Sequence, residues 1–203
     1  MKPVDRSEIL DYVTYTEKRE EIRAAALRAK SVRRILVGES FTFLFENRET
    51  IRYQVQEMMR VEKIVKEDDI RHELSTYNEL IHQKGTLGDK HVPWIHNIRN
   101  TDVAVGIDDE AERDAKLREW VGLNEHIYAL LPDGTRAKPT WDPRQVGEQR
   151  LSSVQYLSFT LPEAPTAIGI SMPGAQAETV LSESQREALQ DDLDAPDPSE
   201  GEE

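Results

Sequence analysis

Cysteine is absent from this chain of 203 residues. Its absence excludes disulfide bonds, thiolate nucleophiles, and iron–sulfur clusters or zinc ions held by cysteine side chains of this chain, and it is typical of a reducing compartment. Long apolar runs are missing as well, since polar residues interrupt every stretch of about 18 residues, the length that a membrane helix needs. The residues from Met1 to Ser7 carry no apolar segment of the kind found in signal peptides. We therefore expect a cytoplasmic protein with no membrane partner.

Basic residues are fewer than acidic ones, and the formal net charge is −13. Most of the excess lies in residues 174–203, which hold ten acidic residues and one basic residue, a net charge of −9. Residues 1–173 hold 29 acidic and 25 basic residues, a net charge of −4. Because binding to nucleic acid by counterion release requires a basic surface, we expect no nucleic-acid partner.

Aromatic residues disappear beyond Met172, where Glu, Asp, Ser, Pro and Ala dominate. This composition predicts a disordered acidic tail over residues 173–203. One segment departs from it, because Leu181 to Gln185 has the spacing of a helix capping box and precedes Leu189 and Leu193. The alternative for this segment is a short amphipathic helix that docks on a partner.

Residues 1–172 have the periodicities of a single α+β domain. Apolar residues at helical intervals predict a long N-terminal helix over 6–32 and a central αα-hairpin made of helices over 49–65 and 68–82. A further helix is predicted from Asp108 to Gly122. Alternating apolar residues predict strands over 34–37, 41–45, 103–107, 127–131, 136–141, 153–161 and, at an edge, 166–170. We expect a mostly antiparallel sheet with the helices packed on one of its faces.

The two helices of the predicted αα-hairpin carry many long polar side chains, which suggests a buried network or a ligand site. The candidate ligands for a divalent metal are Glu57, Glu62, His72 and Glu73. Oxygen and nitrogen donors with open positions would suit iron, manganese or zinc. The alternative is that Glu62 and Glu73 form ordinary ion pairs with Arg60 and Arg71 across the helix joint.

Motifs of the familiar enzyme classes are missing. Glu79 and His82 have the Glu-x-x-His spacing of di-iron helical bundles, but no second such motif lies on another helix. The sequence also lacks a glycine-rich phosphate loop, a dinucleotide fingerprint and the nucleophile elbow of hydrolases. Whether the protein is an enzyme stays open at this point.

A small anion is the other ligand that the sequence suggests. Asn47 can cap the helix that follows it, and Arg48 and Arg52 lie one turn apart at the same helix end. Outward-facing N–H groups and two guanidinium groups could hold a phosphate or a carboxylate. The alternative is that Asn47 serves only as a cap and the arginines pair with Glu46 and Glu49.

Three segments resemble a known family. They are LFENRETIRYQVQEMMRVE over 44–62, HELSTYNEL over 72–80 and SVQYL over 153–157. The chain resembles, over about residues 5–162, an uncharacterised bacterial family, a domain of unknown function. Genes of that family often lie beside genes for rubrerythrin-like proteins and iron–sulfur oxidoreductases. The resemblance implies a role in oxidative stress, near peroxide or iron handling, with such a redox protein as the partner, and it supplies no catalytic residues.

Two functions from different classes follow from these observations. The first is a non-catalytic accessory or interaction protein that serves a redox or iron-handling partner. The second is a binding protein or an enzyme that holds a metal or a small anion between the helices at 49–65 and 68–82. The polar signature favours the second, whereas the incomplete ligand set favours the first.

Overall fold

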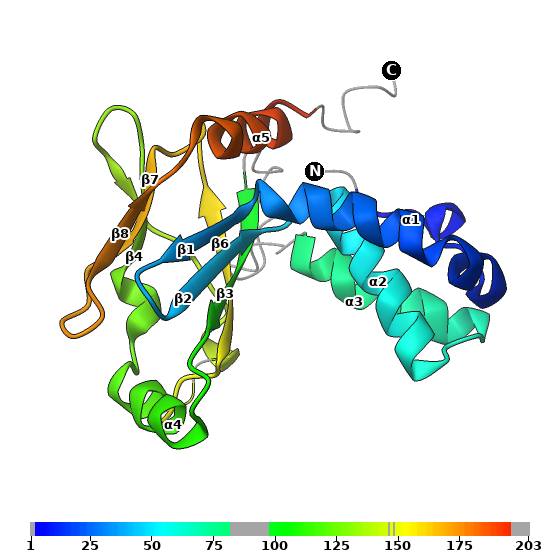
Figure 1. The fold of residues 1–203 in the computed structure, drawn as a ribbon, viewed down its shortest axis with the longest axis horizontal. Helices are drawn as coiled ribbons and strands as arrows, with labels where there is room; N and C mark the ends of the chain where they lie inside the picture. The colour runs from blue at the N-terminus through cyan, green and yellow to red at the C-terminus, as the bar shows by residue number, and fades with distance from the viewer. Residues whose placement is uncertain (1–2, 82–97, 146, 148, 196–203) are drawn as a thin grey trace, which may run out of the picture. The chain divides into compact units, whose positions relative to one another are not determined.

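The computed structural model describes residues 3–81, 98–145, 147 and 149–195 (Figure 1). The chain divides into two compact units. One, here called the helical unit, comprises Met1–Val32, Glu46–Ile95 and Ala195–Glu203; the other, the β unit, comprises Arg33–Phe45 and His96–Asp194. Across the described ranges, no helix combines the length and the apolar composition needed to cross a bilayer.

The helical unit begins with α1, Tyr12–Ser31, which starts later than the predicted residue 6. The capping box of Asp5 is present, but it closes only a short 3₁₀ turn, Arg6–Glu8. The chain then leaves the helical path, because the N–H and C=O groups of Leu10 bond to the side chain of Gln56 at 2.7 and 3.2 Å. Asp11 therefore caps the long helix, accepting hydrogen bonds from the N–H groups of Val13 and Thr14.

The predicted αα-hairpin is present as α2, Arg48–Glu62, and α3, Glu67–Ile81. Asn47 and Thr50 form a reciprocal capping box at the start of α2. The helix ends at Lys63, which has a left-handed backbone with φ 55°. The apolar stripes of both helices meet in one buried cluster, which contains Val4, Ile9, Ile51, Val55, Met59, Ile70 and Leu74.

The β unit contains two antiparallel four-stranded sheets. The first has the order β1-β2-β3-β6, with bounds Arg34–Val37, Phe41–Phe45, Ile98–Val105 and Val154–Thr160. The second has the order β5-β4-β7-β8, with bounds Arg136–Ala137, Ile127–Leu130, Ala167–Ile170 and Ala177–Val180. Two further helices belong to this unit, α4 (Glu110–Glu119) and α5 (Glu183–Asp194).

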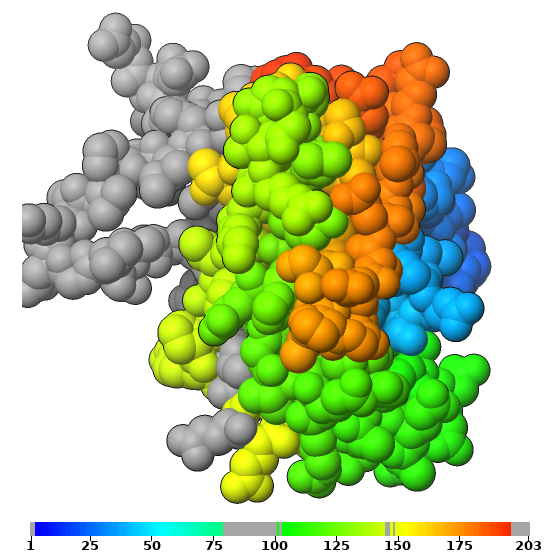
Figure 2. Space-filling view, turned by 90° about the vertical axis from the view of Figure 1, so that its left-hand side faces the viewer, coloured from blue at the N-terminus to red at the C-terminus, as the bar shows by residue number. Residues whose placement is uncertain are grey.

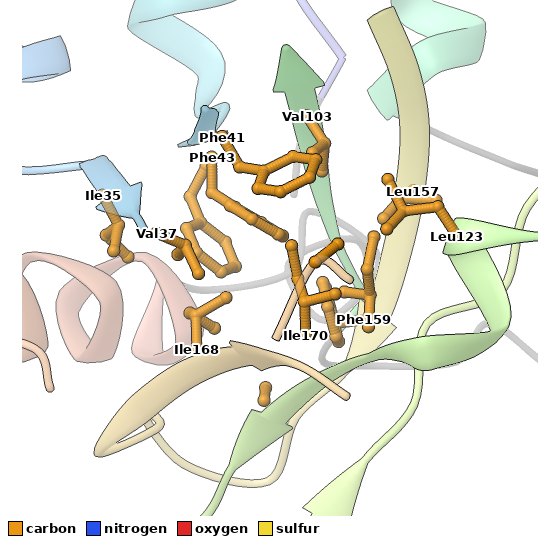
Figure 3. Close-up of a cluster of buried hydrophobic side chains, with 14 of the residues drawn as sticks. Ile35, Val37, Phe41, Phe43, Val103, Leu123, Leu157, Phe159, Ile168 and Ile170 are labelled. Atoms are coloured by element: carbon orange, nitrogen blue, oxygen red, sulfur yellow. The ribbon is translucent and has the colours of Figure 1, made fainter. Parts of the chain in front are cut away.

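The two sheets enclose one apolar core, seen in Figure 3. Phe41, Phe43 and Phe45 all face it, as their alternation predicted, and Phe43 pairs with Val103 on the neighbouring strand. Gly38, with φ 61°, makes the tight turn of the β1–β2 hairpin. β1 also lies beside β8, where the Thr179 hydroxyl donates to the Leu36 carbonyl at 2.7 Å; Figure 2 shows β8 in orange next to the blue atoms of the first hairpin.

The α+β class and the antiparallel pairing are confirmed, but the prediction of a single sheet is wrong. The strands form two sheets that cover each other, and the first three helices have a core of their own. Residues 166–170 were predicted as an edge strand, yet β7 lies between β4 and β8 and is buried along its whole length. β3 begins at Ile98, earlier than the predicted 103, and is paired on both sides.

The prediction of a disordered tail over 173–203 is wrong for its larger part. Residues 177–194 form β8 and α5, while 196–203 lie outside the described residues. Leu181 and Leu189 are buried in the β-unit core, so few apolar residues suffice where a sheet already offers a surface. The capping box is present, with Gln185 N–H donating to the Ser182 hydroxyl and Ser182 N–H to the Gln185 side chain. This helix packs on its own chain, and Arg33 fixes it by an ion pair of 2.7 Å with Asp192.

Candidate functional site

The densest polar network of the helical unit joins α1 to α2 and is centred on Glu57. Arg19 grips its carboxylate with two hydrogen bonds of 2.8 and 3.0 Å. The Tyr15 hydroxyl donates to the same carboxylate at 2.7 Å, and Arg60, one turn along α2, approaches to 3.4 Å. Tyr15 is 1% exposed, so its hydroxyl has this carboxylate in place of water.

The ionisation of the network follows from these contacts. Burial by itself raises the pKa of Glu57, but hydrogen bonds from Arg19, Tyr15 and Arg60 outweigh that effect and bring the pKa to about 2. Burial and the Glu57 carboxylate both raise the pKa of Tyr15 above its usual value. At neutral pH the network therefore consists of one carboxylate, two guanidinium groups and a neutral phenol, and no member is poised to exchange a proton.

The predicted metal ligands do not assemble as one set. Glu57 is engaged by the network above, whereas Glu62 and His72 are exposed at the joint between α2 and α3. Burial raises the pKa of Glu73, the nearby Glu62 carboxylate raises it further, and His72 opposes the rise. Within the described ranges, no three His, Asp or Glu residues converge in a way that could hold a metal ion. His82 of the Glu-x-x-His motif lies outside the described residues.

The arginines near the joint do form ion pairs, but these lie within single helices and do not cross the joint. Arg60 pairs with Glu57 within α2, and Arg71 pairs with Glu67 within α3 at 2.9 Å. Arg6, near the N-terminus, also contacts Glu67, at 2.9 Å. The charged residues of the joint therefore stabilise single helices and the N-terminal segment.

The three predicted anion-binding residues each have a different environment and do not form one site. Asn47 accepts a hydrogen bond from the Thr50 N–H as the cap of α2. Arg48 pairs with Glu8 and donates to the Pro3 carbonyl at 3.3 Å, so it ties the N-terminal segment to α2. Arg52 forms no ion pair with any residue that the structure describes, and it is the one member of this set that faces an open hollow.

That hollow, of about 200 Å³, lies between α1 and α2. Its lining consists of Glu21, Ile22, Ala25, Ala26, Glu49, Arg52 and Tyr53. Lys30 lies over the Tyr53 ring at 6.0 Å and is itself held by Glu46 at 3.7 Å. The hollow therefore combines an apolar floor with two carboxylates, one guanidinium group and an aromatic ring that is in contact with Lys30.

A second polar cluster is buried in the β unit. The Asn124 amide donates to the Gln155 side chain at 2.9 Å, and Gln155 donates to the carbonyls of Ser152 and Val154. Asn124 Oδ1 and the Thr101 hydroxyl have no partner among the described atoms. None of these groups titrates near neutral pH, so the cluster offers fixed hydrogen-bonding groups and no acid or base.

One end of the helical unit exposes several large apolar side chains. Because Tyr15 contacts Glu57 while Lys30 contacts Glu46, α1 and α2 run antiparallel, and the first turn of α1 lies at the same end as the last turn of α2. Four large apolar residues are exposed at this end: Tyr12 by 38%, Val13 by 64%, Val61 by 64% and Val65 by 68%. Such a group of exposed side chains is a feature of interaction surfaces.

Sequence reasoning missed Tyr15 and Arg19, which give Glu57 its role. They lie four residues apart on α1 and so share one helix face, a spacing visible in the sequence. What the sequence did not show is that α1 is the neighbour of Glu57, since its predicted neighbour was α3. Glu57 was predicted as a metal ligand near His72 and Glu73 of α3, whereas the partners of its carboxylate in the structure lie on α1 and on α2 itself.

The chain is similar to proteins whose activity has not been determined. Its structure resembles a crystal structure of a novel protein of unknown function from Burkholderia pseudomallei K96243, with a TM-score of 0.78 and 24% sequence identity over 95% of this chain and 100% of that one. No curated protein matches the chain. A family model matches residues 3–193, a range that includes β8 and α5. The chain therefore belongs to the family described as protein of unknown function (DUF3501).

Proposed function

We propose that this protein is a non-catalytic accessory protein that binds a protein partner through the apolar end of its helical unit. The observation that carries the proposal is the exposure of Tyr12, Val13, Val61 and Val65 at that end. Burying large apolar side chains is the main source of affinity in protein–protein contacts. Tyr12 and Val13 lie on α1, Val61 lies on α2 and Val65 lies in the joint that follows α2, and the Glu57 network links the two helices.

The contacts of the signature segment support a scaffolding role for it. Glu57 is held by Arg19 and Tyr15, Arg48 by Glu8, and Gln56 by the backbone of Leu10. Each of these polar side chains joins α2 to an earlier part of the chain. The segment thereby builds the surface rather than offering reactive groups.

The partner class comes from the resemblance of residues 44–62 to its family. We propose a rubrerythrin-like or iron–sulfur redox protein, which places this chain near iron or peroxide handling. An accessory protein for such a partner needs no metal ligands of its own, since the partner carries the redox centre.

The experiment is a titration of the full chain with a purified rubrerythrin-like protein from the same genome, followed by calorimetry. Val61→Ser combined with Val65→Ser should weaken binding by at least about tenfold, because two anchoring side chains are lost. Val180→Ser is the matched control, since Val180 is 74% exposed on β8 of the other unit, and it should bind as the wild type does. Equal affinity of the double variant would contradict this surface, and no complex at all would contradict this partner class.

A divalent metal bound near the α2–α3 joint is the second candidate function. The feature that favours it is the nearness of two carboxylates, because burial and the nearby Glu62 carboxylate both raise the pKa of Glu73. A bound cation would relieve the repulsion between these two carboxylates. Elemental analysis of the purified protein, with a titration of Mn²⁺ into the wild type and into Glu73→Gln, tests it. A metal-free wild type that does not bind Mn²⁺ would contradict this candidate function.

A further inference from the structure

We propose that the hollow between α1 and α2 binds a small zwitterion, a molecule with an ammonium group, a carboxylate group and a short apolar side chain, as in a free amino acid. This site lies elsewhere on the helical unit than the apolar end, and its ligand is independent of the protein partner proposed above. The inference stands on the shape of the hollow, on three charged side chains that form no ion pair within the described ranges, and on the contact between its aromatic wall and Lys30.

Small side chains create the space. Ala25 and Ala26 of α1 face Glu49 and Tyr53 of α2, and a methyl group fills little of the gap between two helices. With Ile22 they form an apolar floor. A volume of about 200 Å³ accepts a ligand of amino-acid size and is below the usual range for drug-sized ligands.

Charged side chains from both helices surround the floor. Arg52 lies one turn from Glu49 on α2 and across the hollow from Glu21, yet none of the three forms an ion pair with a residue in the described ranges. All three therefore have hydrogen-bonding capacity left for a ligand. A guanidinium group grips a carboxylate with two parallel N–H donors, and carboxylates accept hydrogen bonds from an ammonium group.

The balance of charge selects the ligand class. Two carboxylates and one guanidinium group give the lining a net charge of −1 at neutral pH, which disfavours phosphate and other multiply charged anions. A ligand with only a carboxylate would satisfy Arg52 and be repelled by Glu21 and Glu49. A zwitterion places opposite charges against both kinds of group.

The aromatic wall of the hollow is Tyr53, whose ring is in contact with Lys30. Lys30 lies over the Tyr53 ring on one side and is anchored by Glu46, whose second carboxylate oxygen is buried without a hydrogen-bond partner among the described residues. The cation–π contact favours this orientation of the ring and so lowers the free energy that a ligand spends on ordering it. An apolar side chain of the ligand can then pack on the ring and on the alanine floor.

The test compares three related probes on the full-length protein by ¹H–¹⁵N correlation spectra. L-leucine carries both charged groups, N-acetyl-L-leucine lacks the ammonium group, and L-leucinamide lacks the carboxylate. At about 10 mM, a concentration suited to the millimolar affinity of a small ligand, we expect L-leucine to shift the amide signals of Ala25, Ala26 and Tyr53. The other two probes should shift them far less.

Two variants link those shifts to the site. Arg52→Gln should weaken L-leucine binding by about tenfold or more, because a charge-assisted hydrogen bond is lost. Arg23→Gln is the matched control, an exposed arginine of α1 outside the hollow, and should leave the affinity unchanged. The proposal is overturned if L-leucine shifts none of these signals, if all three probes shift them equally, or if both variants bind alike.

Discussion

A carboxylate that loses water on burial stays ionised only when hydrogen bonds replace the lost solvent, and Glu57 receives them from Tyr15, Arg19 and Arg60. The side chain of Glu57 is 17% exposed, so most of its hydration has been exchanged for these contacts. The arrangement is reciprocal, because Tyr15 and Arg19 would in turn be left without a partner if the carboxylate were removed. At the scale of single residues, this is the contact that joins α1 to α2.

We predict that Glu57 makes the stability of the protein fall in acid. Its pKa is about 2 in the folded protein and 4.5 in its ordinary state, so the unfolded chain binds more protons between these values. The contribution is fully present above about pH 4.5 and is lost as the pH falls toward 2. A shift of this size corresponds to about 3 kcal/mol, so Glu57→Gln should lower the free energy of unfolding at pH 7 by about that amount.

Urea denaturation of both proteins at several pH values measures the effect. The difference between wild type and Glu57→Gln should shrink as the pH falls below about 4, since the wild-type carboxylate becomes protonated as well. Glu62→Gln is the matched control, because Glu62 is an exposed carboxylate on the same helix and should cost less than about 0.5 kcal/mol. A difference between wild type and Glu57→Gln that does not depend on pH would show that the loss is not electrostatic.

At the scale of elements, α5 is a helix that depends on its surroundings. Glu183, Glu187 and Asp191 repeat at four-residue intervals on its exposed face, where like charges disfavour a helix. Acidic residues also fill its last turn, opposite to the preference of the helix dipole. The helix forms because Leu189 is buried and Asp192 pairs with Arg33.

We predict that removing α5 destabilises the β unit. Leu189 is 2% exposed, so Leu189→Ala should lower the free energy of unfolding by about 2–4 kcal/mol through lost burial and a cavity. Glu187→Ala is the matched control on the exposed face and should change it by less than about 0.5 kcal/mol. Truncation before Ser182 should lower the melting temperature beyond the effect of Leu189→Ala, as measured by circular dichroism. An unchanged melting temperature of the truncated chain would contradict this prediction and would mean that the segment is a tail without a structural role.

Elements with local signals could be predicted from the sequence, and elements that depend on distant partners could not. The alternation of Phe41, Phe43 and Phe45 and the glycine turn before it predicted the first hairpin, because strand and turn are encoded side by side. β3 begins with the polar run Arg99 to Asp102, which becomes a central strand only because β2 and β6 pair with it from far along the chain. The composition of 173–194 suggested disorder for the same reason, since the sheet that covers its two buried leucines is not visible locally.

At the scale of the whole molecule, the described residues form two apolar clusters that have no residue in common. It leaves the helical unit after Val32, forms the β1–β2 hairpin in the β unit and returns at Glu46. This interleaving explains why the candidate site was predicted only in part. Glu57 and Arg52 were singled out because α2 is rich in polar residues, but the hairpin inserted before α2 hid the fact that α1 is their neighbour.

The last prediction is that each cluster stabilises its own unit. Phe43 is 0% exposed in the β-unit core, and Met59 is 2% exposed in the helical-unit core. Phe43→Ala should lower the free energy of unfolding by about 3–5 kcal/mol, and Met59→Ala by about 2–5 kcal/mol.

Native-state hydrogen exchange locates these losses along the chain, because it reports the opening free energy of each amide. Phe43→Ala should reduce protection chiefly at amides of β2, β3 and β6, and Met59→Ala chiefly at amides of α2 and α3. Val180→Ala, at an exposed position, should leave both sets unchanged. If either core variant lowered protection equally in both units, the chain would unfold as one cooperative body in spite of its two separate cores.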